Sequence, residues 1–196
     1  MEEKRLIIVA VGGQGNLFAS NVLCQAALLA NLPVRMSEIH GMAQRGGIVE
    51  SAIVFGDVQS SLISDGKADI LLGFEPSETL RALNKANPNT IVITNTAPMP
   101  PFTANIGIGT YPSLVTIIKL LSEKSKKLIT IDATSLAKQA ENPLAVNMVL
   151  LGALIQTQIL PITPEQTKEA IRLKSKKGFE EKNITAFELG YAAAAA

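Results

Sequence analysis

The order of apolar runs and glycines at the start of the chain constrains its fold more than any other feature. Residues 6–11 (LIIVAV) form a short run rich in β-branched side chains, which is typical of a buried strand. The run ends in a glycine turn at residues 12–15 (GGQG), and apolar residues then recur at helical spacing over residues 17–30. A strand, a glycine turn and a helix in this order predict the first unit of an α/β fold.

The rest of the chain continues this alternation. Further strands are predicted at residues 34–38, 48–55, 70–74, 90–95 and 128–132, and helices at residues 76–86 and 113–124. After residue 132 the patterns are helical, including residues 143–159 and a helix that begins with a capping box at Thr163 and Gln166. We therefore predict a three-layer α/β/α Rossmann-like domain with a mostly parallel sheet and a helical C-terminal segment. Residues 1–190 are expected to form one domain, and residues 191–196 a tail.

Composition excludes several classes of protein. The 18 Lys and Arg against 17 Asp and Glu give a net charge of +1, which argues against strong nucleic-acid binding. The longest apolar stretch, residues 148–155, is far shorter than the roughly 20 residues that a membrane span needs. The N-terminus carries no secretory hydrophobic region, so the cytoplasm is the expected compartment. Hydrophobic residues make up 47% of the chain and charged ones 18%, which favours a partner subunit over an apolar monomer.

The glycine turn is the first candidate site, and it comprises Gly12, Gly13, Gln14 and Gly15. Glycines allow close backbone approach, and the unpaired amides at a helix N-terminus attract an anion. The turn resembles a dinucleotide fingerprint, with Ala10 in place of the first glycine and Glu38 as the candidate ribose ligand. Three interpretations stay open here: a tight structural turn, an anion or cofactor-phosphate contact, and true nucleotide binding.

A second glycine-rich segment, residues 37–47 (SEIHGMAQRGG), holds the only histidine of the chain. Its candidate contact residues are His40, Gln44, Arg45, Gly46 and Gly47. Arg45 can grip a carboxylate or phosphate with paired hydrogen bonds, and His40 can donate a proton or contact a ligand. The structural alternatives are a capping histidine and an arginine in a salt bridge. We expect this loop to lie beside the glycine turn at the ligand-binding edge of the sheet.

Known catalytic arrangements do not match the chain. It has no Gly-x-Ser-x-Gly elbow, no Walker sequence and no pair of carboxylates that stands out from the surface background. Its one cysteine, Cys24, lies on the apolar side of the first predicted helix and is expected in the core, so metal ligation is not predicted. The sequence does not indicate an enzyme that works alone.

Together, the two glycine segments resemble the gamma-type domain of the 2-oxoacid:ferredoxin oxidoreductase family. Within the family, the likeness is greatest to the beta subunit of the indolepyruvate type. It extends to Asn147 and the apolar residues after it (NMVLLGAL), and it covers the chain to about residue 189. Ala10 departs from the glycine of many members, which weakens the nucleotide interpretation more than family membership.

The resemblance implies a subunit of a complex that oxidatively decarboxylates arylpyruvates to an acyl-CoA and passes electrons to ferredoxin. Thiamine diphosphate and iron–sulfur clusters are expected on a larger partner subunit, because one cysteine cannot hold a cluster. This chain would line one wall of the active site or contact coenzyme A, with Asn147 added to the candidate contact residues. The alternatives are a stand-alone nucleotide-binding oxidoreductase and a purely structural docking module.

Overall fold

The computed structural model describes residues 2–41, 47–99 and 110–195 of the chain. Its centre is a six-stranded sheet in the order β2-β3-β1-β4-β5-β6. The strands are β1 (Lys4–Val11), β2 (Val34–His40), β3 (Ile48–Phe55), β4 (Ile70–Gly73), β5 (Ile91–Asn95) and β6 (Lys127–Ile131). β1, β4, β5 and β6 pair in parallel, whereas β3 is antiparallel to both β1 and β2. Five strands therefore run in one direction, and the prediction of a mostly parallel sheet is confirmed.

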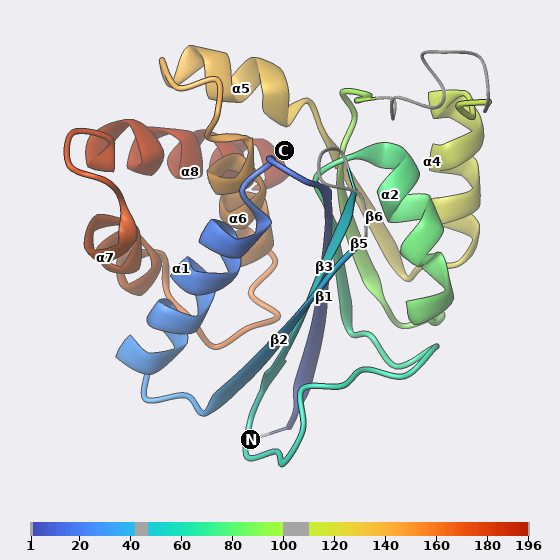
Figure 1. Ribbon diagram of the computed structural model, residues 1–196, viewed down its shortest axis with the longest axis horizontal. Helices are drawn as coiled ribbons and strands as arrows, with labels where there is room; N and C mark the ends of the chain where they lie inside the picture. Colours follow the sequence, from blue (N-terminus) through green and yellow to red (C-terminus); the bar gives the residue numbers. More distant parts are fainter. Residues whose placement is uncertain (1, 42–46, 100–109, 196) are drawn as a thin grey trace.

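Helices cover both faces of the sheet (Figure 1). One face carries α1 (Asn16–Leu29), α5 (Ala133–Gln139), α6 (Val146–Gln156), α7 (Pro164–Lys174) and α8 (Glu180–Ala195). The other carries α2 (Pro76–Arg81), a short 3-10 helix (Ala82–Lys85) and α4 (Leu114–Glu123). The predicted three-layer α/β/α architecture with a helical C-terminal segment is confirmed.

The central strand β1 is buried on both faces. Leu6, Ile8 and Ala10 pack under α1 and α6, while Ile7 and Val9 pack on the side of α2 and α4. Successive side chains of a strand point to opposite faces, so a strand between two helical layers has to be apolar throughout. This is why residues 6–11 are a continuous apolar run rather than an alternating one.

Several elements differ from the sequence prediction at their ends. The long helix predicted at residues 143–159 is shorter, because a turn from Asn142 to Ala145 precedes α6 and Gln158 takes a left-handed conformation after it. The helix predicted at residues 76–86 divides into α2 and the 3-10 helix. α8 continues to Ala195, and Tyr191 packs against the core. The helix thus continues across residue 190, and the predicted division there into a domain and a tail stays a proposal.

None of the helices in the part of the chain that the structure describes has the length and apolarity needed to cross a bilayer.

Candidate functional site

The carboxyl ends of β1 and β4 form the switch point of the fold. The two strands are parallel neighbours, but α1 follows β1 onto one face and α2 follows β4 onto the other. In open α/β sheets, ligands bind in the crevice at such a point, outside the carboxyl ends of the strands. The glycine turn directly follows β1, so the sequence places its first candidate site at this position.

A hollow of about 290 Å³ lies between the glycine turn and the end of β2. It is lined by Val11, Gly12, Gly13, Gly15, Asn16, Leu17, Glu38, His40 and Val49. Gly13 and Gly15 have φ of +100° and +80°, a left-handed conformation that favours glycine. The backbone N–H of Gly12 donates to the carbonyl oxygen of Gly47 at 2.8 Å, which joins the two glycine segments. The structure thus brings His40 and Gly47 beside the turn, as the sequence predicts.

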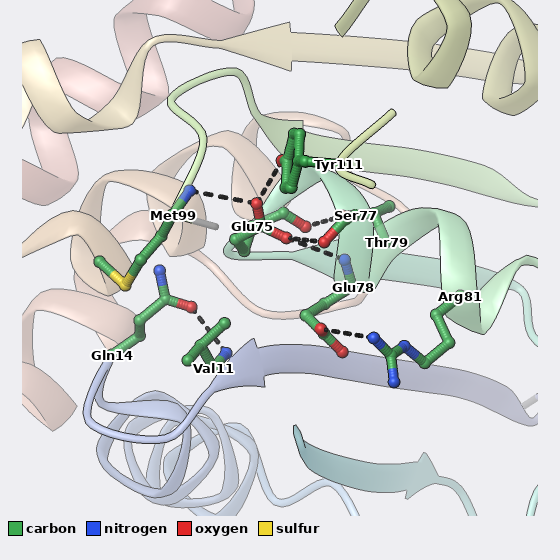
Figure 2. A network of polar contacts seen from close by, with 9 residues as sticks. All are labelled: Val11, Gln14, Glu75, Ser77, Glu78, Thr79, Arg81, Met99 and Tyr111. Carbon is green, nitrogen blue, oxygen red and sulfur yellow. Dashed lines mark hydrogen bonds and ion pairs between the residues drawn. The ribbon is translucent and has the colours of Figure 1, made fainter. Parts of the chain in front are cut away.

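Gln14 points away from this hollow, toward β4 (Figure 2). Its Oε1 accepts a hydrogen bond from the backbone N–H of Val11 at 2.8 Å, and its Nε2 donates to the carbonyl oxygen of Phe74 at 3.3 Å. The side chain therefore closes the turn on itself and ties it across the switch point to the end of β4. This geometry makes Gln14 a support of the turn.

Asn147 supports the turn from the side of α6. Its Nδ2 donates to the carbonyl oxygen of Gly15 at 3.1 Å, and its Oδ1 accepts from the backbone N–H of Met148. A Cβ on Gly15 would lie 2.5 Å from Nδ2 of Asn147, so close packing as well as φ requires glycine here. Asn147 is 4% exposed and acts on the hollow through Gly15, not by lining it.

His40 and Glu38 form the charged side of the hollow. They are two residues apart on β2 and therefore on one face, with Nε2 of His40 3.2 Å from Oε2 of Glu38. The His40 side chain is 60% exposed and that of Glu38 only 14%. Among the lining residues that the structure describes, His40 is the one side chain that can carry a positive charge. An anion in the hollow would thus meet the Glu38 carboxylate as well as the amides of the turn.

Glu38 does not occupy the position that a dinucleotide fold requires. It lies inside β2, with its Oε1 3.3 Å from the hydroxyl oxygen of Ser51 on β3. β3 runs antiparallel between β1 and β2, whereas the dinucleotide fingerprint needs the two strands as parallel neighbours. The arrangement favours the other interpretations of the glycine turn.

Asn16 is a residue of the site that the sequence reasoning missed. It is 4% exposed, and its Nδ2 donates to the carbonyl oxygen of Val49 at 3.0 Å. Its Oδ1 accepts from Ser51 at 2.7 Å and from Ser20 at 3.2 Å. A buried amide with partners on α1 and β3 holds the start of the helix against the sheet. An asparagine directly after the last glycine of the turn was the only local signal.

Gln44, Arg45 and Gly46 lie outside the described residues. Their predicted contacts with an anion, a substrate or coenzyme A therefore stay predictions. Gly41 and Gly47, which flank the segment, are joined to β3 and to the glycine turn by backbone hydrogen bonds.

A second polar network, also missed from the sequence, lies where β4 ends. Glu75 is fully buried, and Figure 2 shows its carboxylate between two groups of donors. One oxygen accepts from the backbone N–H of Glu78 at 2.9 Å and from Ser77 at 2.7 Å, which caps α2. The other accepts from the backbone N–H of Met99 at 3.2 Å and from the hydroxyl of Tyr111. Glu75 thus joins α2 to two segments far along the chain.

Glu78 is less well satisfied. It is 4% exposed, its Oε1 lies 3.2 Å from Nη2 of Arg81, and its Oε2 is buried without a hydrogen-bond partner in the described part of the chain. Burial raises the pKa of the Glu78 carboxyl above its ordinary value, and the nearby Arg81 offsets only part of this effect.

We expect the Glu78→Gln variant to be more stable than the wild type at neutral pH. Because the folded-state pKa is raised, the folded state holds the proton more tightly, and ionisation of Glu78 costs stability as the pH rises above about 4.5. The advantage of the variant should shrink as the pH falls below that value. Urea unfolding at neutral pH and at a pH below about 4.5 measures the difference in stability between the variant and the wild type. The exposed Glu123→Gln is the control. A constant difference across the range would contradict the assignment.

The chain has one cysteine and one histidine as nitrogen or sulfur ligands for a metal ion. The described ranges contain no group of three or more His, Cys, Asp or Glu side chains that could hold a metal ion. The single cysteine, Cys24, is partly buried on α1, and burial raises the pKa of its thiol to about 11. Iron–sulfur clusters are usually held by four Cys thiolates, or by two Cys and two His, and a chain with one cysteine and one histidine does not fit such a group.

Comparison with known proteins decides the family. Residues 5–193 match the family described as pyruvate ferredoxin/flavodoxin oxidoreductase. The chain belongs to this family. It is 43% identical to the indolepyruvate oxidoreductase subunit IorB of Pyrococcus horikoshii over 196 residues, which covers 99% of this chain and 97% of that relative. The resemblance drawn from the two glycine segments is confirmed.

Two solved structures of the oxidoreductase family share the fold. The gamma subunit of a keto/oxoacid ferredoxin oxidoreductase from Geobacter sulfurreducens matches with a TM-score of 0.71 and 20% identity, over 98% of this chain and 99% of that one. The pyruvate oxidoreductase subunit PORC from Thermotoga maritima matches with a TM-score of 0.72 and 20% identity, over 98% and 97%. The chain therefore shares its overall fold with these two subunits.

Proposed function

We propose that this chain is the small subunit of an indolepyruvate-type 2-oxoacid:ferredoxin oxidoreductase and works only in complex with a larger subunit. The observation that carries the proposal is the 43% identity to an indolepyruvate oxidoreductase subunit along nearly the whole of both chains. The relative shares the full length of the chain rather than one motif, so the surfaces that serve the complex fall within the matched region.

The proposed complex oxidises an arylpyruvate in the presence of coenzyme A. The bond between the carboxylate and the keto carbon breaks, carbon dioxide leaves, and the acyl group forms a thioester with the coenzyme A thiol. The electron pair released passes to two molecules of oxidised ferredoxin, and one proton is released. We place this reaction in the cytoplasm.

Thiamine diphosphate and the iron–sulfur clusters belong, in this proposal, to the larger subunit. Cys24 is the one cysteine of the chain, so it cannot supply a cluster. The chain also lacks a Gly-Asp-Gly sequence followed by Asn-Asn, the pattern of a thiamine site. Thiamine diphosphate would supply the carbanion chemistry of decarboxylation.

In this proposal, the chain contributes polar backbone and side-chain groups, at the carboxyl edge of its sheet, to one wall of the active site. Residues of the glycine turn and the first turn of α1 line the hollow, and α1 has no side-chain cap within the described residues. Arg45 would supply positive charge, and His40 a hydrogen-bond donor, for a substrate carboxylate or a coenzyme phosphate. Gln14 and Asn147 hold the turn in place from its two sides.

We expect Arg45→Ala in the assembled complex to raise the KM for the oxoacid or for coenzyme A by about 10- to 100-fold, the loss of one charge-assisted hydrogen bond. Reduction of ferredoxin or a viologen dye by arylpyruvate measures the KM for each substrate. Arg5→Ala is the matched control, because Arg5 lies at the opposite, amino end of β1.

Each outcome decides between the candidate roles. If both KM values and turnover stay unchanged while the complex assembles, Arg45 has no ligand role. If Gln14→Ala and Arg45→Ala lower the yield of assembled complex and leave the kinetics of the complex that does form unchanged, the loops dock the partner instead. If the wild-type chain forms no complex with the larger subunit, the proposed function itself is wrong.

A further inference from the structure

A second hollow, here called the basic groove, lies on the far side of the glycine turn. It has a volume of about 370 Å³, and its lining residues come from the first turn of α1, the start of α6, the end of α7, the start of α8, and the connections before α6 and α8. It is lined by Phe18, Asn142, Leu144, Asn147, Lys174, Lys176, Phe179 and Asn183. Nothing in the proposed function uses it.

Buried amides fix the floor of the basic groove. Nδ2 of Asn142 donates to Oδ1 of Asn183 at 2.9 Å, and Nδ2 of Asn183 donates to the hydroxyl of Ser175 at 2.9 Å. Asn147, between this groove and the glycine turn, donates to Gly15. These bonds link the segment before α6, the end of α7 and the start of α8, so the groove is preformed. The Asn183 amide already makes hydrogen bonds to protein groups, so fewer buried polar groups remain to bind a small ligand.

Exposed apolar side chains form the walls. Leu144 is 81% exposed and Phe179 47% exposed, and both line the groove. Leu17, 48% exposed, stands beside Phe18 on the first turn of α1 and lines the neighbouring hollow. Single exposed apolar residues are ordinary, but several around one preformed groove mark an interaction surface.

The two charged side chains among the described residues that line the groove are both positive. Lys174 and Lys176 line it, and none of its described lining residues is acidic. Other lysines of the same helices are paired, Lys168 with Glu188 and Lys182 with Glu141. In the described parts of the chain, neither Lys174 nor Lys176 has a carboxylate within salt-bridge distance. The groove therefore suits an occupant that is both apolar and acidic.

A second copy of this chain fits the groove poorly. A two-fold dimer that buries this patch brings the lysines of both copies, Lys174 and Lys176, into one interface without acidic groove residues among those described to pair with them. Like charges facing each other across an interface cost several kcal/mol. The charge pattern favours a different chain.

We propose that the basic groove is the docking site for an apolar, acidic segment of the larger subunit. The inference rests on the proposed function and deepens it. Leu144 and Phe179 enclose the apolar side chains of that segment, and Lys174 and Lys176 pair with its carboxylates. Asn147 lines the groove and donates to Gly15, so the docked segment contacts a residue that supports the glycine turn.

The test is assembly of the complex after co-expression with the larger subunit. We expect Leu144→Asp, and separately the pair Lys174→Glu and Lys176→Glu, to weaken association at least 10-fold, as loss of a central apolar or charged contact does. Val115→Asp is the matched control for Leu144, because Val115 is 80% exposed on α4 of the opposite layer. Lys126→Glu with Lys127→Glu, at the amino end of β6, is the control for charge. Thermal melting of each isolated variant shows that it folds.

The outcomes distinguish a failure of this inference from a failure of the proposed function on which it rests. If the wild-type chain and both groove variants assemble equally well, the groove does not dock the partner, although the proposed function stands. If the wild-type chain itself fails to assemble, the proposed function fails. Unchanged assembly with a raised KM for coenzyme A would assign the groove to a small anionic ligand. A wild-type homodimer that Leu144→Asp converts to a monomer would assign it to a second copy. Each of these results overturns the proposal.

Discussion

The Gly190→Ala variant is expected to lose about 3 kcal/mol of stability, although alanine favours helices more than glycine does. A Cβ at Gly190 would lie 1.8 Å from the carbonyl oxygen of Val149 on α6. On the other side of the same contact, a Cβ at Gly152 would lie 2.0 Å from the carbonyl oxygen of Phe187 on α8. Backbone atoms meet the added group in both cases, so no side chain can turn away to make room. The two helices would have to separate.

Thermal unfolding of the isolated chain measures this effect, and we expect the midpoint to fall by about 10 °C. Ala193→Val is the matched control, because it enlarges an exposed residue of α8. Its cost should stay below about 1 kcal/mol, the range of helix propensity. A Gly190→Ala variant that melts with or above the wild type would contradict the backbone contact between α6 and α8.

The contact matters for the site because α6 carries Asn147 at its start. Asn147 donates to Gly15, and residues from Asn147 to Ile155 are buried without interruption. A displaced α6 would therefore withdraw the support of the glycine turn. The sequence shows that residues 143–159 are apolar but not that two glycines bring two helices together, since that pairing joins positions far apart in the chain.

Local patterns predicted most of the strands and the position of the turn. Residues 48–55 were predicted as a strand and form β3, and Thr163 caps α7 with Gln166 as the capping box predicts. Such features depend on neighbours within a few residues, which a sequence displays. The reversed direction of β3 is a choice between parallel and antiparallel pairing, and the length of the connection decides it: residues 41–47 are too few for the crossover of about a dozen or more residues that parallel strands need. Periodicity carries no information on that choice.

The same distinction explains which site residues were found. Gly15 and Gln14 lie in one short turn and were recognised by type and spacing, whereas Asn147 came only from the family resemblance. Glu75 precedes Pro76, a position typical of a helix cap, so part of its role was readable. Its other partners, Met99 and Tyr111, lie 24 and 36 residues away, and no local pattern predicts these contacts.

Removing the negative charge of Glu75 is the second change with a large expected effect. The Glu75→Gln variant should lose about 3 kcal/mol, because an amide has one acceptor oxygen and turns its NH₂ group toward donors that the carboxylate now satisfies. Either the cap of α2 or the bonds to Met99 and Tyr111 would be broken in a fully buried site (Figure 2). Urea unfolding measures the loss. Ser77→Ala removes a single one of these bonds and should cost about 1 kcal/mol.

The titration of Tyr111, followed while the protein stays folded, gives a second measurement of the same contact. Burial raises the pKa of the Tyr111 hydroxyl above its ordinary value, and its hydrogen bond to the negative Glu75 raises it further. In Glu75→Gln the pKa should fall toward the ordinary value but stay above it, because burial remains. Ultraviolet absorbance of tyrosinate follows the change, with Tyr191→Phe as the background that leaves one tyrosine. An unchanged titration in a folded variant would show that Tyr111 does not bind Glu75.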